Sequence, residues 1–318
     1  MNQSHLALFR RVRLFSSGAV ALAIVFSVIF STSLGKDSLD WQIVMAALAL
    51  AVGIPHGALD HLVTLKSSAP FRMALFITLY VCAALLAIWA ILQWNVFGFI
   101  AVVLMSSLHF GVGDSAFIAE LDRLGNRQGT SIPVWAYASA GGLLPVIIPL
   151  VNSRSSEALG KINANLIDWH YGATAYIQIG VAAISTLSLV TLLLRKRFRD
   201  VVDIALLAAL AIFAPPLVAF SVYFGCWHAM RHTARLTSLL PNSLQAYERG
   251  SEFGAFKAAV VPGLPALLGT IIFIALLAGF SQTELSSSFL WLTLVTVWAL
   301  TVPHMIVTAR LDRAAFKS

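Results

Sequence analysis

The chain has 318 residues, of which 59% are hydrophobic and only 11% are charged, and its mean hydropathy is +0.85. This composition excludes an ordinary soluble globular protein and is typical of a polytopic membrane protein. The net charge of +7 does not indicate nucleic-acid binding, because the basic residues fall between the apolar segments, where they are typical of loops that face the cytoplasm.

Apolar segments follow one another along almost the whole chain. A membrane-spanning helix needs about 20 apolar residues, so 318 residues can hold many spans. The sequence predicts an all-α polytopic transmembrane helical bundle of about ten helices, with nine or eight as alternatives, forming a single integral-membrane domain over residues 1–318. The predicted segments are 14–34, 41–64, 73–92, 96–119, 132–151, 173–194, 201–214, 217–239, 260–280 and 288–309.

The boundary at Pro215 and Pro216 has an alternative, in which one bent helix over 201–239 gives nine spans and an external C-terminus. The charge distribution favours ten spans. With the N-terminus inside, only Lys36, Arg154 and Lys161 lie in outward-facing loops, as the positive-inside rule prefers. We therefore expect a multi-pass protein of the cell inner membrane with short cytoplasmic N- and C-terminal tails.

His228 and His232 are the first candidate site residues, because they stand four residues apart inside an apolar segment. Ionisable side chains are costly in a membrane and mark functional sites there. Positions i and i+4 of an α-helix lie on one face, so both rings can converge on one metal ion. The pair alone is compatible with iron, zinc, copper or haem.

His56 lies in a second apolar segment, beside Pro55 and close to Asp60. The proline and its flanking glycines predict a kink or a break in the helix. Asp60 can orient a histidine ligand or anchor a neighbouring helix, and a buried polar pair at a packing kink is the alternative. His61 points about 140° away from His56 on a regular helix, so we assign it a supporting or interfacial role.

His109 lies in a third apolar segment, with Asp114 five residues later. Direct contact between the two needs a distorted helix, which Gly111 and Gly113 permit. A histidine hydrogen-bonded between packed helices remains the alternative. The ten-span topology places His56 and His109 at nearly the same depth as the histidine pair, which predicts a four-histidine metal site inside the bundle.

His304 has a similar predicted depth, but we place it in the second shell or the substrate cavity because four ligands are available without it. For Arg231, in the histidine-pair segment, we expect the guanidinium to reach toward the cytoplasmic headgroups, with a pair to Asp60 or Asp114 as the alternative.

Four motifs together resemble the Brp/Blh family of bacterial and archaeal membrane β-carotene 15,15'-dioxygenases, which are associated with retinal supply for rhodopsins. The motifs are Gly53-Ile54-Pro55-His56-Gly57-Ala58-Leu59-Asp60, His109-Phe110-Gly111 with Asp114, Trp227-His228-Ala229-Met230-Arg231-His232, and Pro303-His304. By this resemblance, the ligands of an Fe(II) ion are His56, His109, His228 and His232.

The resemblance also implies the reaction, which is cleavage of the central double bond of all-trans-β-carotene by O₂ to give two all-trans-retinal. The substrate would come directly from the bilayer lipid, and a retinal-receiving rhodopsin would be a physiological partner. Aromatic side chains near the ligands would line the polyene tunnel, with lipid-facing or core packing as the alternative: Phe110, Tyr223, Phe224 and Trp227.

Three other functions remain open on sequence grounds. A membrane desaturase or hydroxylase also uses clustered histidines with non-haem iron, but it commonly has several closely spaced histidine pairs, whereas this chain has one. A haem-binding electron carrier and a non-enzymatic carotenoid-binding or rhodopsin-assembly factor are the other two.

Overall fold

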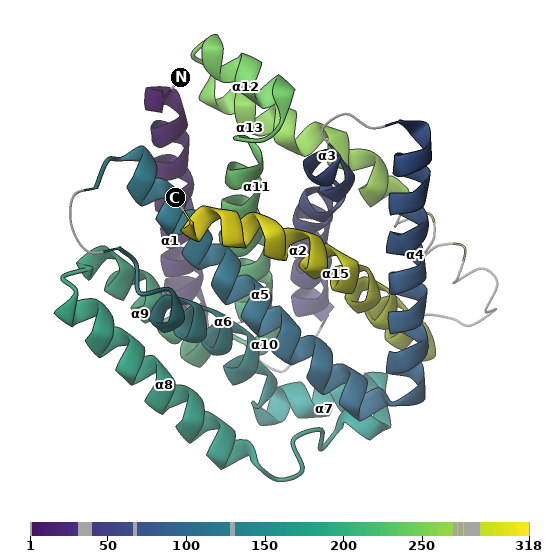
Figure 1. The fold of residues 1–318 in the computed structure, drawn as a ribbon. Coiled ribbons are helices and arrows are strands. Elements are labelled where there is room, and N and C mark those ends of the chain that lie inside the picture. Colours follow the sequence, from purple (N-terminus) through teal and green to yellow (C-terminus); the bar gives the residue numbers. More distant parts are fainter. Residues whose placement is uncertain are drawn as a thin grey trace.

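The computed structural model describes residues 2–30, 40–65, 69–127, 131–269, 272, 276 and 287–317. Every regular element in these residues is helical, which agrees with the predicted fold class (Figure 1). The elements are α1 (Asn2–Ile29), α2 (Asp40–Gly57), α3 (Asp60–Thr64), α4 (Pro70–Gln93), α5 (Asn95–Leu124), α6 (Val134–Leu150), α7 (Ser153–Ile162), η1 (Ala164–Leu166), α8 (Thr174–Leu194), α9 (Phe198–Phe213), α10 (Pro216–Ser221), η2 (Val222–Ala229), α11 (Met230–Leu236), α12 (Pro241–Glu248), α13 (Glu252–Val260), η3 (Val261–Gly263) and α15 (Ser287–Phe316).

Six helical segments of the described chain are long and apolar enough to cross a membrane. They are α1, α2 together with α3, α4, α5, α8 and α15, while α6 is a shorter apolar helix. The predicted count of ten spans is therefore not confirmed. The predicted segments 201–214 and 217–239 coincide with α9 and with the continuous run from α10 to α11, and segment 260–280 is described only over 260–269 and at residues 272 and 276.

The helix break at the two prolines is present where the sequence predicts it. Helix α9 ends at Phe213, Ala214 is extended with φ −84° and ψ 148°, and Pro216 opens α10. The residue before a proline avoids the helical region, and a proline is tolerated in the first turn of a helix. This break lets the segment that carries the histidine pair start in a new direction.

Helix α5 runs through the middle of the bundle and packs most closely against α6 (Figure 1). At the crossing, a Cβ atom on Gly111 would lie 2.0 Å from the carbonyl oxygen of Ala138, and one on Gly142 would lie 1.9 Å from that of Ser107. Small residues of this kind allow membrane helices to approach closely. Gly111 therefore serves helix packing, and α5 is continuous from Asn95 to Leu124, without the distortion that a direct contact between His109 and Asp114 would need.

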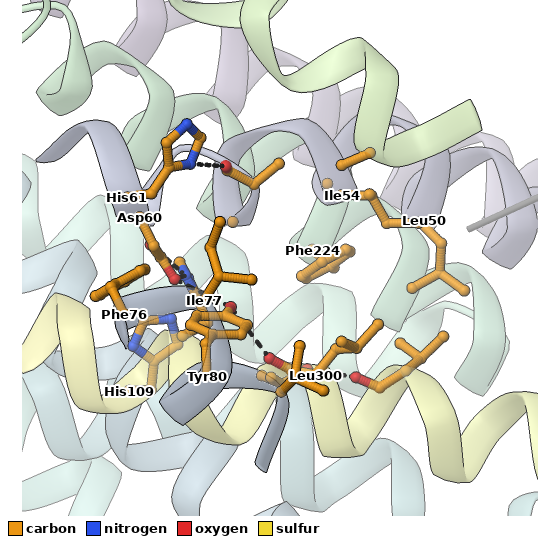
Figure 2. Close-up of a pocket in the computed structure, with 18 of the residues that line it drawn as sticks. Leu50, Ile54, Asp60, His61, Phe76, Ile77, Tyr80, His109, Phe224 and Leu300 are labelled. Atoms are coloured by element: carbon orange, nitrogen blue, oxygen red, sulfur yellow. Dashed lines mark hydrogen bonds and ion pairs between the residues drawn. The ribbon is translucent and has the colours of Figure 1, made fainter. Parts of the chain in front are cut away.

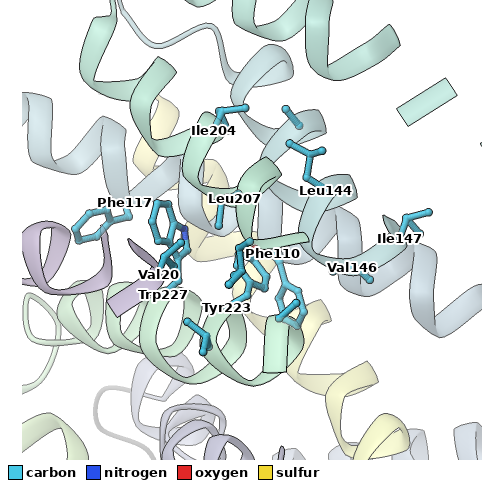
Figure 3. Close-up of a cluster of buried hydrophobic side chains, with 14 of the residues drawn as sticks. Val20, Phe110, Phe117, Leu144, Val146, Ile147, Ile204, Leu207, Tyr223 and Trp227 are labelled. Atoms are coloured by element: carbon cyan, nitrogen blue, oxygen red, sulfur yellow. The ribbon is translucent and has the colours of Figure 1, made fainter. Parts of the chain in front are cut away.

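The hydrophobic core lies where α5, α6, α9 and η2 meet (Figure 3). Phe110 and Tyr223 lie side by side in this core, with ring centroids 5.7 Å apart, and Phe117 and Trp227 are fully buried members of the same cluster. The core therefore fixes α5 against η2, the two elements that carry His109 and His228.

Both ends of the described chain lie at the same end of the bundle. Leu6 of α1 lies beside Gly125, just after α5, and Arg123 near the end of α5 donates a hydrogen bond to the carbonyl of Ala315 in α15 at 2.6 Å. Arg13 reaches the first turn of α9 at this end. The segments that carry Arg13, Arg123 and Arg197 thus lie on one side of the molecule.

Candidate metal centre

Four histidine rings from four elements cluster inside the bundle: His109 of α5, His228 of η2, His232 of α11 and His304 of α15. All four are buried, with at most 7% of each residue exposed. The centroid of the His109 ring lies 5.1 Å from that of His228, 6.4 Å from His232 and 5.2 Å from His304. His232 lies 6.1 Å from His228 and 5.6 Å from His304.

These spacings suit rings arranged around one ion. Two imidazoles bound to the same metal at about 2.1 Å place their ring centroids roughly 4.5 to 6.5 Å apart, depending on the angle between the bonds. As placed, however, no three His, Cys, Asp or Glu groups among the described side chains could hold a metal ion. Imidazole nitrogens are ligands that suit a transition metal, so the donor chemistry of the cluster fits one, but side chains would have to move to form the site.

His228 and His232 lie on either side of a change in helix type. Residues Val222–Ala229 form a π-helix, and an α-helix resumes at Met230. π-Helical turns are rare and frequent at functional sites. The sequence predicted an ordinary α-helix here, and the structure corrects this, although the two rings still face each other at an interplanar angle of 25°.

Helix α2 ends at Gly57, immediately after Pro55 and His56, and α3 starts at Asp60, which confirms the predicted break. The His56 side chain lies outside the described side chains, so its assignment as a ligand stays a prediction. The break turns Asp60 toward α15 and α4, where it binds a histidine that the sequence did not connect with it.

Asp60, Tyr80 and His304 form a hydrogen-bonded group from three elements, α3, α4 and α15. Nδ1 of His304 lies 3.0 Å from both carboxylate oxygens of Asp60, and the hydroxyl of Tyr80 donates to Oδ2 of Asp60 at 3.1 Å. Sequence reasoning missed Tyr80. Its only signal was a phenol in an otherwise apolar span, and its partner is 20 residues away in another helix.

Asp114 binds the opposite side of the cluster. Its Oδ2 accepts hydrogen bonds from the hydroxyl of Tyr223 at 3.1 Å and from Nε1 of Trp227 at 2.9 Å, and its Oδ1 lies 3.4 Å from Nδ1 of His228. Gly113 leaves the space for this histidine, since a Cβ atom there would lie 3.3 Å from Cε1 of His228. Asp114 therefore contacts a predicted ligand, but on η2 and not on its own helix.

The structure contradicts the expectation that the guanidinium of Arg231 reaches toward the cytoplasmic headgroups. Its guanidinium is fully buried and does not reach the membrane surface, and it pairs with neither Asp60 nor Asp114. Instead it donates to the carboxylate of Asp203 at 3.3 Å and to the hydroxyl of Tyr137 at 3.0 Å, and its Cζ atom lies 3.5 Å from the centroid of the Trp227 ring. Tyr137 of α6 and Asp203 of α9 therefore accept the hydrogen bonds that lipid headgroups were expected to accept.

A pocket of about 370 Å³ opens beside the histidine cluster, bounded by α2, α3, α4, α5, η2 and α15 (Figure 2). His109, His304 and Asp60 lie in its wall, and most other lining side chains are apolar. On the outer side, the lining residues Ile77 and Val81 of α4 are about half exposed. The cluster is thus reachable through an apolar opening between helices.

The four aromatic residues predicted to line a tunnel separate into two groups. Phe110 and Phe224 line the pocket, and Gly53 gives Phe224 its room, since a Cβ atom there would lie 2.1 Å from the Phe224 ring. Tyr223 and Trp227 are instead fully buried and donate to Asp114. His61 also lines the pocket, with its Nδ1 atom 3.1 Å from the carbonyl of Ala58.

Comparisons with known proteins agree with the resemblance of the motifs. The family described as beta-carotene 15,15'-dioxygenase matches residues 47–312. A beta-carotene 15,15'-dioxygenase of the uncultured marine bacterium 66A03 is 29% identical over 286 residues, which cover 86% of this chain and 94% of that protein. A probable beta-carotene 15,15'-dioxygenase Blh of Halobacterium salinarum is 24% identical over 306 residues, which cover 85% of this chain and 84% of that protein. No solved structure matches the chain.

Proposed function

Because this chain belongs to the beta-carotene 15,15'-dioxygenase family, we propose that it cleaves the 15,15' double bond of all-trans-β-carotene with O₂. One O₂ supplies one oxygen atom to each half of the broken bond, so the products are two molecules of all-trans-retinal. The related proteins carry this activity in their names. The observation that carries the proposal is the cluster of buried histidines that opens onto an apolar pocket.

The pocket suits a substrate dissolved in the bilayer. β-Carotene is a hydrocarbon, so a binding site for it needs apolar walls and few polar groups. Ile77 and Leu300, at the pocket rim, are exposed apolar residues on two helices long enough to span a membrane. The substrate would enter sideways from the lipid and would not have to cross water.

The proposed metal is a non-haem Fe(II), with His56, His109, His228 and His232 as the predicted ligands. Imidazole nitrogens are suitable ligands for iron. When bound, the iron would supply the binding and activation of O₂. The described donor set fits this role because three of the four predicted rings lie together in a buried cluster, and the side chain of the fourth is outside the described side chains.

The other pocket residues would bind and orient the polyene. Phe110 lies between the pocket and His228, with its ring centroid 4.4 Å from that of the histidine, so it borders the place where the central double bond would have to stand. Phe224 forms the wall toward α2. Holding the reacting bond at a fixed place beside the metal is the contribution that these residues would make to the rate.

We also propose that the protein resides in the cell inner membrane with both termini in the cytoplasm, and that its product can supply a retinal-binding rhodopsin. The shared position of the two termini and of Arg13, Arg123 and Arg197 supports this orientation. Reporter fusions after Gln282 and at Ser318 test it. An external C-terminus would contradict the proposed topology.

Expression in cells that accumulate β-carotene tests the activity. We expect loss of β-carotene and the appearance of retinal, measured by chromatography of the extracted pigments. His228→Ala and His232→Ala should each abolish retinal formation while the protein still inserts in the membrane. His170→Ala is the matched control, since His170 pairs with Asp168 away from the cluster and should leave cleavage unchanged.

Three results would contradict the proposal. Unchanged β-carotene under aerobic, iron-replete conditions would exclude the cleavage reaction. Bound carotenoid without any aldehyde would support a carotenoid-binding or rhodopsin-assembly factor. Full activity of both histidine variants would refute the ligand assignment.

A further inference from the structure

We propose that His304 is a direct ligand of the metal centre, and that Asp60 is the carboxylate that orients it. The inference rests on the proposed function in one respect, namely that a metal is bound at the histidine cluster. It extends the ligand set to α15, a helix that the predicted four-histidine site does not use.

The position of the His304 ring supports this role. Its centroid lies 5.2 Å from that of His109 and 5.6 Å from that of His232, within the same range as the spacings among the predicted ligands. The residue is 5% exposed and lies in the pocket wall together with His109. His304 is thus placed as a member of the cluster and not as a second layer behind it.

The orientation of the ring supports it as well. With both oxygens of Asp60 3.0 Å from Nδ1, a neutral His304 carries its proton on Nδ1 and donates it to the carboxylate. The lone pair is then on Nε2, at the other side of the ring. A carboxylate that holds one nitrogen of a histidine while the other binds a metal is a recurring arrangement at metal sites.

His109 is held in a comparable way. Its Nδ1 atom lies 3.3 Å from Oγ1 of Thr308, whose hydroxyl donates to the carbonyl of His304 at 3.0 Å. The Thr308 oxygen is therefore available to accept the Nδ1 proton of His109. Since His228 also turns Nδ1 toward a carboxylate oxygen, that of Asp114 at 3.4 Å, three rings present the same nitrogen to an outer oxygen. All three would then bind a metal through Nε2.

The alternative explanation of the Asp60–His304 pair is purely structural, namely that the pair only anchors α15 to α3. The two explanations differ in what an amide would do at position 304. The side chain of His304→Gln can still donate to Asp60, but it lacks the imidazole nitrogen. If His304 only anchors α15, His304→Gln should leave the affinity for the metal unchanged. If His304 is a ligand, the same substitution should lower that affinity.

The experiment measures Fe(II) binding by the purified full-length protein in detergent, by metal analysis and by titration. The wild type should bind one iron per chain. His304→Gln and His304→Ala should each lower the affinity by at least ten-fold, and Asp60→Asn should lower it by about 10- to 100-fold. Added imidazole should partly restore binding to His304→Ala. Cobalt(II) substituted for iron provides a second readout, because its visible absorption changes when a ligand is lost.

His61→Ala is the matched control for metal binding. His61 is next to Asp60 in the chain and lines the same pocket, but its Nδ1 atom contacts a backbone carbonyl. Its removal should leave the iron stoichiometry and the cobalt spectrum unchanged. Size-exclusion chromatography shows which variants are folded, and His304→Gln decides the question if His304→Ala aggregates.

The possible outcomes separate the inference from the proposed function. Wild-type affinity and an unchanged cobalt spectrum in His304→Gln would overturn the role of His304 and leave the metal centre standing. A wild type that binds no metal under reducing conditions would overturn the metal centre itself, and the inference with it.

Discussion

Two buried carboxylates, those of Asp60 and Asp114, lie on either side of the histidine cluster. Each contacts a tyrosine hydroxyl and a histidine ring, but their surroundings differ. On the pocket side, Asp60 accepts a hydrogen bond from the hydroxyl of Tyr80 and contacts Nδ1 of His304. Its surroundings are the apolar walls of the pocket, which include no lysine or arginine among the described lining residues.

On the core side, Asp114 accepts hydrogen bonds from Tyr223 and Trp227 and contacts Nδ1 of His228. Trp227 in turn lies under the guanidinium of Arg231, which continues into a buried network of charged groups. One tyrosine, one carboxylate and one histidine thus border an apolar pocket on one side and join packed helices on the other. The surroundings decide which role dominates.

The largest expected effect is on the core side, at Arg231. Arg231→Leu would remove one buried partner from the carboxylate of Asp203, which keeps Arg13 at 2.8 Å, so the cost should approach but not exceed the about 3 to 5 kcal/mol typical of a broken buried ion pair. We expect a large fall in the thermal midpoint of the purified protein and in its yield. The control is Arg72→Leu on α4, an exposed residue whose loss should change neither quantity. A midpoint for Arg231→Leu equal to the wild type would show that the charged network is not what stabilises this side.

The two carboxylates themselves provide the next comparison. Asp114→Ala would leave the buried donors of Tyr223 and Trp227 without their acceptor, at a cost of about 1 to 3 kcal/mol for each group. Asp60→Ala should cost less stability, because Tyr80 lies at the pocket and can also reach the carbonyl of Leu300, 3.5 Å away. Thermal unfolding of the two variants in the same detergent measures the difference. Equal thermal midpoints of Asp114→Ala and Asp60→Ala would contradict the expectation that Asp114 contributes more to stability than Asp60.

This difference explains what the sequence could and could not predict. Long apolar runs predicted the helices, and the topology predicted that His109, His228 and His232 lie at one depth, where their rings are indeed clustered. The first inference depends on a pattern that repeats along the chain, and the second on the position of each histidine within its own predicted span. They need no knowledge of which helices are neighbours.

The parts that could not be predicted depend on partners from distant helices. Arg231 meets Asp203, 28 residues earlier, and His304 meets Asp60, 244 residues away. From the sequence alone, a membrane arginine is expected to reach for water, since nothing in its own segment can solvate it. The π-helix at Val222–Ala229 was also unpredicted, because its hydrophobicity resembles that of an ordinary helix.

A change at the pocket mouth should affect the substrate and not the fold. Ile77→Trp adds bulk to an exposed pocket-lining residue of α4, so we expect kcat/KM for β-carotene to fall about five-fold, through KM, while the thermal midpoint stays unchanged. Leu79→Trp is the control, because Leu79 is exposed on the same helix but does not line the pocket. An equal fall in kcat/KM for both variants would contradict access through this opening.

The smallest expected effect comes from the two tyrosines, which are matched in the bond that they donate. Tyr223→Phe removes a fully buried hydroxyl from Asp114 and should cost about 1 kcal/mol of stability, since Trp227 and His228 remain beside the carboxylate. Tyr80→Phe should change stability by less, because Tyr80 is only half-buried, but it should weaken Fe(II) binding about two- to three-fold by loosening the carboxylate that holds His304. Thermal unfolding and iron titration of both variants separate the two effects. If Tyr223→Phe weakened iron binding more than Tyr80→Phe, then Asp114, and not Asp60, would be the carboxylate that controls the metal centre.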